Sequence, residues 1–137
     1  MNFAKTIIFI KTNSYMKQII HSSEAPAAIG PYSQAVLAGN TLYVSGQIAL
    51  EKASLGDIKA ETEQIMKNIG YILSEASMSY ENIVKASIFL KNMDDFTSVN
   101  EVYGSYFSEN PPARETVQVA KLPRDVNVEI SVIAYKN

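Results

Sequence analysis

The last segment of the chain, residues 126–135, limits the fold more than any other part of the sequence. One of its faces carries branched apolar residues at every second position: Val126, Val128, Ile130 and Val132. This alternation is typical of a β-strand that buries one face in a core. The other face begins polar, with Asn127 and Glu129, and ends apolar with Ile133 and Tyr135. The segment therefore predicts a sheet in which both faces need some cover.

Two segments in the middle of the chain have helical periodicity. In the first, apolar residues share one face: Ile65, Ile69, Ile72, Leu73 and Ala76. Polar residues are predicted to lie largely off that face: Glu63, Lys67, Asn68 and Glu75. Asp57 is the predicted N-cap of this helix. The second segment has an apolar stripe from Phe96 to Phe107; Asp94 or Asp95 is expected to cap it, and Pro111-Pro112 to stop it.

Short β-rich runs surround these helices. Residues 33–38 and 41–48 flank Gly39-Asn40, which predicts a tight antiparallel hairpin. Ile83–Leu90 reads as a further strand, and residues 116–122 and 126–135 are expected to form a closing hairpin.

With a short strand near Ile19, the order β-β-β-α-β-α-β-β predicts an α+β fold with a single mixed β-sheet and both helices packed on one face. Two helices cover only one side of such a sheet. The apolar residues on the other side predict a homo-oligomer, in which another subunit covers that face.

The chain has 137 residues, the size of one domain. We assign residues 16–137 to this domain and residues 1–15 to an N-terminal extension, either loose or produced by an upstream start codon. The extension holds one run of apolar residues, Ile7 to Ile10, which is shorter than a secretory signal requires.

Composition excludes several classes of site. The sequence has no cysteine and one histidine, His21, so the usual ligands of a zinc site are missing and no metal is expected. Its glycines form no dinucleotide or phosphate-binding motif, so no cofactor is expected. With a net charge of −2, nucleic acid is a poor partner, and no membrane association is expected. A chain without cysteine fits a reducing compartment, and we expect a cytoplasmic location.

Three short constellations could carry chemistry. Gly30-Pro31-Tyr32 presents an aromatic hydroxyl at the start of a strand, and Ser45-Gly46-Gln47 interrupts a strand with glycine. Glycine at such a place often marks a bulge or the close approach of another group. Pro111-Pro112-Ala113-Arg114 is a stiff segment that delivers an arginine to a strand. Each of these, taken singly, is more often a plain turn or a solvated side chain.

Taken in order, four stretches of the sequence resemble the RidA (YjgF/YER057c-like) family of reactive-intermediate imine deaminases. The stretches are APAAIGPYSQA, VSGQI, IVKASIFLKNMDDFTSVNEVY and PPARETVQVAKLPRDVNVEIS. The resemblance covers the chain from about residue 16 to residue 134. It implies a chorismate-mutase-like sheet backed by two helices, and a homotrimer with ligand clefts between subunits.

The resemblance also implies site residues, matched motif by motif. Arg114 would hold the substrate carboxylate, and Glu129 and Tyr32 would complete the catalytic set. The substrate-binding residues it implies are Gly46, Asn100, Thr116 and Ser45. Many relatives have a cysteine where this chain has Thr116. Glu115 replaces the small residue expected there, and strand alternation should point it away from the site.

The chemistry of these residue types agrees with hydrolytic deamination of 2-imino or enamino acids, such as 2-aminoacrylate, to 2-oxo acids and ammonium. Arginine offers a planar fork for the carboxylate of a small 2-imino or 2-oxo acid. A glutamate can orient water or exchange a proton with the imine nitrogen. Two alternatives stay open: a non-catalytic, small-carboxylate-binding or regulatory trimer, and a ribonuclease or translation inhibitor, which the acidic composition disfavours.

Overall fold

A computed structural model describes residues 16–137 of the chain, and the predicted N-terminal extension, residues 1–15, lies outside the described residues. The strands are β1 (Gln18–Ile20), β2 (Ala35–Ala38), β3 (Thr41–Gln47), β4 (Ile83–Leu90), β5 (Ala113–Gln118) and β6 (Val128–Tyr135). The helices are α1 (Leu50–Ala53), α2 (Ile58–Glu75) and α3 (Phe96–Gly104). Short 3₁₀ turns at Tyr80–Asn82, Met93–Asp95 and Pro123–Asp125 join some of them.

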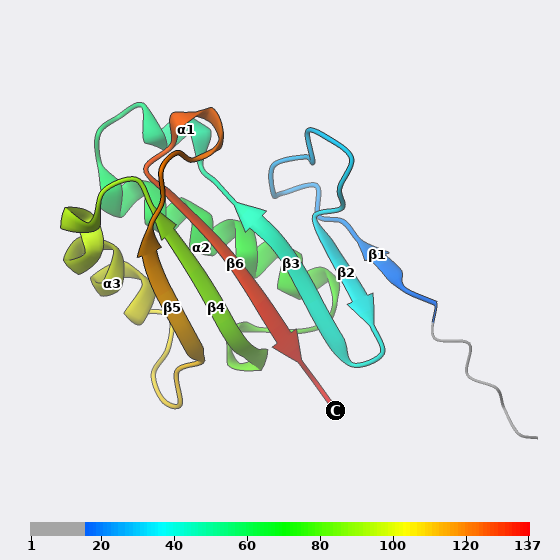
Figure 1. Ribbon diagram of the computed structural model, residues 1–137. Coiled ribbons are helices and arrows are strands. Elements are labelled where there is room, and N and C mark those ends of the chain that lie inside the picture. Colours follow the sequence, from blue (N-terminus) through cyan, green and yellow to red (C-terminus); the bar gives the residue numbers. More distant parts are fainter. Residues whose placement is uncertain (1–15) are drawn as a thin grey trace, which may run out of the picture.

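The strands form one six-stranded mixed sheet in the order β1-β2-β3-β6-β4-β5. All neighbours are antiparallel except β4 and β5, which run parallel. Helices α2 and α3 both lie on the same side of the sheet, behind the strands in the view of Figure 1. This is the predicted α+β fold: a single mixed sheet with two long helices on one face. The short helix α1, before α2, was not predicted.

The two predicted hairpins had different outcomes. The first is confirmed, because β2 and β3 pair antiparallel around Gly39, which adopts a φ of 61°. The second is wrong: β6 lies between β3 and β4, while β5 pairs with β4 at the sheet edge. Strand β5 follows α3 in the chain, and from that helix it reaches the edge of the sheet beside β4. Strand β6 is more apolar and is buried at the centre of the sheet. Strand β5 also starts at Ala113, earlier than predicted, and ends at Gln118.

Helix α2 begins as its sequence predicts. The Asp57 carboxylate accepts hydrogen bonds from the backbone N–H groups of Lys59 and Ala60. Its apolar face is fully buried against the sheet. Asn68, predicted to lie off that face, is also buried, because it faces the cavity at the end of β3 and not the solvent.

Helix α3 differs in detail from its prediction. Asp95 occupies the N-cap position but makes no side-chain hydrogen bond there. Asn92 instead caps the preceding 3₁₀ turn, accepting from the backbone N–H of Asp94. The helix ends at Gly104, well before the prolines at 111 and 112. Its buried residues, Val99 and Tyr103, belong to the predicted stripe.

A buried carboxylate ties α2 to the start of β6. Glu61 is fully buried and accepts hydrogen bonds from the backbone N–H groups of Asn127 and Val128 and from the Asn127 side chain, at 2.7 to 3.3 Å. These donors satisfy a charge that would otherwise be costly to bury. The contact fixes the beginning of the strand that carries Glu129.

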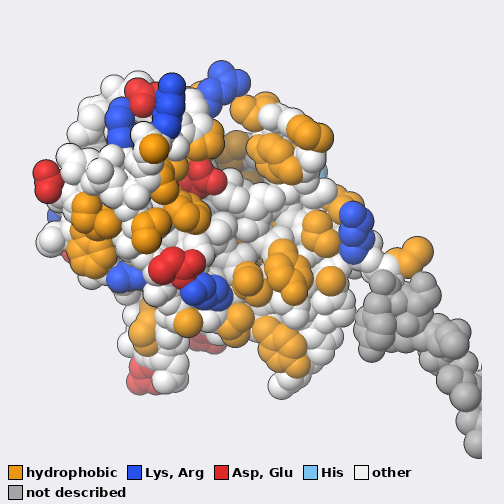
Figure 2. All heavy atoms as spheres, viewed as in Figure 1, with side chains coloured by type: hydrophobic (Ala, Val, Ile, Leu, Met, Phe, Trp, Pro, Cys, Tyr) orange, Lys and Arg blue, Asp and Glu red, His pale blue; other side chains and the backbone are white. Residues whose placement is uncertain are grey.

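The face of the sheet opposite the helices is uncovered and largely apolar. Its half-buried or exposed side chains come from four strands: Tyr43, Phe89, Val117, Ile133 and Tyr135. In the same view, Figure 2 shows hydrophobic side chains spread across this face, with few charges among them. Polar groups interrupt it at two places: an ion pair between Lys85 and Glu115 that also holds Ser87, and Glu129, which pairs across the strands with Phe89. This is the apolar face for which the sequence predicts a covering subunit.

Candidate functional site

A β-bulge at the end of β3 opens the space in which the candidate site lies. Val44 pairs with Val132 and Gln47 with Ile130, so three steps along β3 match two along β6. The extra residue falls in Ser45-Gly46, where the sequence predicts either a bulge or a close approach. Both are present. A Cβ atom at Gly46 would lie 2.8 Å from the carboxyl carbon of Glu129 and closer still to one of its oxygens.

Glu129 projects from the second position of β6 into a cavity of about 1020 Å³. The carboxylate accepts no hydrogen bond and joins no ion pair within residues 16–137, and burial raises its pKa above the ordinary value for glutamate. A carboxyl group in such surroundings exchanges its proton closer to neutral pH than an exposed one. It therefore suits a group that transfers protons.

Tyr32 and Ser45 line the same cavity as Glu129. Tyr32 is held by a tight turn, in which its own N–H donates to Gly30 and its hydroxyl accepts from the Ile29 N–H. Ser45 donates its hydroxyl to the carbonyl oxygen of Ser33 at 2.7 Å, which ties the bulge to the loop that precedes β2. The structure thus brings together four of the predicted site residues: Tyr32, Ser45, Gly46 and Glu129.

Arg114 and Asn100 line a second, smaller cavity of about 440 Å³ at the other side of the sheet. The arginine Nη1 donates to the Asn100 Oδ1 at 2.6 Å. Its guanidinium carbon lies 5.1 Å from the centre of the Tyr103 ring and 5.7 Å from that of Phe96. Helix α3 therefore supplies both a hydrogen-bond acceptor and aromatic faces that hold the guanidinium plane in one orientation.

Thr116 lies on the same face of β5 as Arg114, two residues further on. Its hydroxyl is buried and, within the described part of the chain, has no hydrogen-bond partner; the same is true of the Tyr103 hydroxyl. Burial raises the pKa of Tyr103, and the charge of Arg114 opposes that shift. Thr116 lines neither cavity. Glu115 points the other way, as alternation predicts, and pairs with Lys85 on the open face.

Within one chain, Arg114 and Glu129 point to opposite faces of the sheet. Arg114 pairs across the strands with Ala86, and Glu129 pairs with Phe89. Paired residues share a face, and Ala86 and Phe89 are three residues apart on β4, so their side chains point to opposite sides. The carboxylate-binding arginine and the glutamate implied by the resemblance therefore belong to different cavities of a single chain.

A family model described as Endoribonuclease L-PSP, the RidA family, matches residues 22–136. The chain belongs to the RidA family. This confirms the resemblance seen in its motifs. The match leaves out only residues 1–21 and residue 137.

Two curated RidA-family relatives and one solved structure show how close the likeness is. A 2-iminobutanoate/2-iminopropanoate deaminase of Mus musculus is 45% identical over 126 residues, 89% of this chain and 93% of that protein. A RutC family protein of Pyrococcus horikoshii is 47% identical over 125 residues, 88% of this chain and 99% of that protein. The crystal structure of Escherichia coli TdcF with bound serine is 36% identical, with a TM-score of 0.82 over 88% of this chain and 99% of that one.

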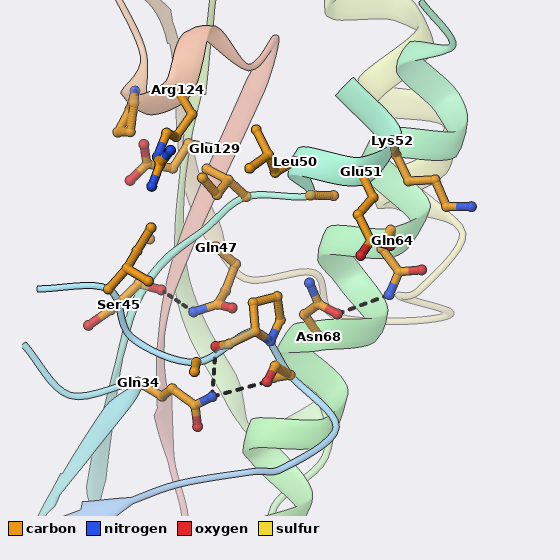
Figure 3. A pocket seen from close by; sticks show the side chains of 18 of the residues that line it. Gln34, Ser45, Gln47, Leu50, Glu51, Lys52, Gln64, Asn68, Arg124 and Glu129 are labelled. Carbon is orange, nitrogen blue, oxygen red and sulfur yellow. Dashed lines mark hydrogen bonds between the residues drawn. The ribbon is translucent and has the colours of Figure 1, made fainter. Parts of the chain in front are cut away.

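Among the residues that line the larger cavity and that the sequence did not predict as site residues, Arg124 and Asn68 are the two that matter most here. Arg124, from the turn before β6, lies at the Glu129 end, and Asn68, from α2, lies at the other (Figure 3). Asn68 accepts from the Gln64 side chain at 3.0 Å, whereas its own Nδ2 is buried without a partner among residues 16–137. Asn68 could not be found from the sequence, because helical periodicity places it outside the apolar stripe. Arg124 could have been found from the sequence, because it is a cation in a short turn directly before the strand that carries Glu129.

The described part of this RidA-family chain contains no helix long and apolar enough to cross a membrane. Over the same residues, no three histidine, aspartate or glutamate side chains gather where they could hold a metal ion.

Proposed function

We propose that this protein hydrolyses reactive 2-imino or enamino acids to 2-oxo acids and ammonium, and that it does so without a cofactor. The observation that carries the proposal is the Glu129 carboxylate, set in the space that Gly46 leaves open and with its pKa raised by burial. The mouse relative, named as a 2-iminobutanoate/2-iminopropanoate deaminase, supports the same reaction. The absence of cysteine supports a reducing compartment such as the cytoplasm.

In the proposed reaction, water adds to the carbon of the C=N bond. Glu129 takes a proton from the attacking water and delivers it to the nitrogen, which gives a carbinolamine. The proton of the new hydroxyl then passes through the same carboxylate to the nitrogen, the C–N bond breaks, and ammonia leaves and is protonated to ammonium in water. The carbon keeps the oxygen of the water as the new 2-oxo group. Positioning of water and imine supplies much of the rate enhancement, because such imines are already electrophilic.

Arg114 is proposed to hold the carboxylate of the substrate. Its hydrogen bond to Asn100 and its position over Tyr103 orient the guanidinium before substrate arrives. A guanidinium that is already oriented loses less entropy on binding, and two parallel bonds to a carboxylate set the direction of the C=N bond. Thr116, with its unpartnered hydroxyl, and Tyr32, at the cavity of Glu129, are proposed to contact substrate as well.

The placement of Arg114 and Glu129 on opposite faces supports a site shared between subunits. One subunit would supply Arg114 and Asn100, and its neighbour would supply Glu129, Tyr32 and the bulge at Gly46. We propose a homotrimer with three such clefts, in which the apolar sheet faces of the subunits cover one another. The uncovered Tyr43, Ile133 and Tyr135 support this arrangement.

The second candidate function is a regulatory trimer that binds small carboxylates without turning them over. The bound serine in the E. coli relative favours it, because that structure holds an amino acid. Glu129 separates the two functions: a protein that only binds anions gains nothing from a carboxylate in the same cleft, since like charges repel.

The deciding experiment is coupled turnover. A pyridoxal-phosphate dehydratase generates 2-aminoacrylate or 2-iminobutanoate, and the decay of the imine signal is followed with and without this protein. Accelerated decay that depends on protein concentration supports the deaminase. Decay at the spontaneous rate, with calorimetric binding of 2-oxo acids retained, would favour the regulatory trimer.

A further inference from the structure

Arg124 occupies an unusual backbone conformation in the turn before β6. Both Arg124 and its neighbour Asp125 have φ near 57°, in the left-handed region that side chains other than glycine seldom adopt. Non-glycine residues in this region persist only where the surrounding structure imposes them, and they gather at functional sites. The two residues are therefore a reason to look at what the turn presents.

The turn is fixed on both sides. Leu122 before it and Val126 after it are buried, at 5% and 0% exposure. The N–H of Asp125 donates to the Leu122 carbonyl, and the Asp125 carboxylate pairs with Lys91 at 3.0 Å. These contacts determine the direction of Arg124, whose own side chain takes no part in holding the turn.

The Arg124 side chain points into the larger cavity at the end where Glu129 lies, as Figure 3 shows. Within residues 16–137 it forms no ion pair, including none with Glu129. The other cation that lines this cavity, Lys52, comes from α1 at the far end, where Glu51 accompanies it (Figure 3). Arg124 is thus an uncompensated positive charge beside the candidate reaction centre.

We propose that Arg124 is a specificity-determining residue that binds a second acidic group, carried at the end of the substrate's side chain. The preferred substrates would be 2-imino acids with a carboxylate side chain, and the products 2-oxo dicarboxylates. This inference rests on the proposed function, in which Arg114 of a neighbouring subunit holds the carboxylate next to the C=N bond. The cavity of about 1020 Å³ leaves room for a side chain of several atoms beyond the reacting carbon.

The test compares two imines, generated in place by amino-acid oxidases from glutamate and from 2-aminobutyrate. The quantity measured is the ratio of kcat/KM for the acidic imine to that for the neutral one. Arg124→Gln should lower this ratio about tenfold or more, the value of a hydrogen bond between charged groups. Arg124→Lys should retain part of the preference, because it keeps the charge but not the planar fork.

Two further variants separate specificity from structure. Lys121→Gln removes an exposed charge from the same loop, outside both cavities, and should leave the ratio unchanged. Arg124→Gly relieves the positive φ, so it should raise the melting temperature while it lowers the ratio as the glutamine variant does. If Arg124→Gly raises the melting temperature but keeps the ratio, Arg124 has only a structural part and the inference is wrong.

Binding measurements keep this inference distinct from the proposed function. Calorimetry compares a five-carbon 2-oxo dicarboxylate with 2-oxobutanoate on the wild-type chain and on Arg124→Gln, and needs no turnover. A dicarboxylate preference that disappears in the variant would uphold the Arg124 subsite even if neither imine is hydrolysed. Equal affinities in the wild-type chain, or a preference that survives in Arg124→Gln, would overturn it.

Discussion

The Glu129 carboxylate occupies the space that a side chain at Gly46 would fill. The bulge in β3 brings the Gly46 backbone against the strand that carries the glutamate, so the missing Cβ is what allows the carboxylate to enter the cavity. This relationship joins two motifs that are far apart in the sequence, and it makes the glycine as specific a feature of the site as the acid.

Gly46→Ala should therefore lower activity with little loss of stability. The added Cβ meets the flexible end of Glu129, which can swing away, so the fold survives while the carboxylate leaves its place. We expect the turnover of the imine to fall by about tenfold or more. A positioned proton-transfer group usually contributes about 10²–10⁴-fold to the rate. The measurement is kcat/KM beside the melting temperature.

Gly70→Ala is the matched control. A Cβ there would collide with the Tyr80 hydroxyl, which donates to the Met66 carbonyl at 2.8 Å, and neither Gly70 nor Tyr80 lines either cavity. This variant should melt at a lower temperature and keep the turnover of the fraction that remains folded. If Gly46→Ala shows the same pattern as Gly70→Ala, Gly46 serves the fold and not the site.

Glu129→Gln should lower turnover and raise stability at neutral pH. Burial raises the pKa of Glu129, so the folded chain still binds a proton at pH values where the unfolded chain has released it. Stability therefore falls as pH rises from the ordinary glutamate pKa through the raised one, and glutamine removes this loss. The melting temperature of the variant should exceed that of the wild type at pH 7, and the difference should shrink as the pH is lowered.

The same substitution has a signature in the pH–rate profile. If the carboxylate form takes the proton from water, kcat/KM of the wild type declines on the acid side with an apparent pKa above that of an ordinary glutamate. Glu129→Gln should lack this decline. A wild-type profile that is flat through this range, or an unchanged rate in the variant, would remove Glu129 from the mechanism.

Arg114→Ala should abolish measurable imine hydrolysis and leave the fold intact, because the side chain lines a cavity and not the core. Loss of a bidentate pair removes roughly 3 kcal/mol of transition-state binding, on the order of 10²-fold in rate. Arg114→Lys should also be slow, since an ammonium cannot form the planar fork. Circular dichroism and oligomer mass provide the controls, and turnover within about twofold of wild type in a folded Arg114→Ala would refute the carboxylate anchor.

Mixing two inactive variants tests whether the site is shared between subunits. In a cyclic trimer built from Arg114→Ala and Glu129→Gln chains, each mixed trimer has one cleft whose arginine and glutamate are both intact. After joint unfolding and refolding, activity should return to about a quarter of the wild-type rate for random assembly. Each variant refolded alone should stay inactive. A mixture as inactive as its components would mean that both residues must come from one chain.

The sequence by itself determined the elements whose signals are local. Asp57 caps α2 because its side chain reaches N–H groups only two and three residues away. Gly39 permits the turn between β2 and β3, and alternation within β5 puts Arg114 and Glu115 on opposite faces. The motifs around Tyr32, Gly46, Arg114 and Glu129 were also sufficient to indicate the family.

Only the tertiary structure decided which of these elements lie together. Strand β6 inserts between β3 and β4, so the expected hairpin with β5 does not form, and this order alone brings Glu129 opposite Gly46. It also separates Arg114 from Glu129 within one chain and turns Asn68 toward a cavity. Caps, turns and alternation depend on neighbouring residues, whereas strand order depends on burial and pairing summed over the whole sheet, which no single stretch of the sequence contains.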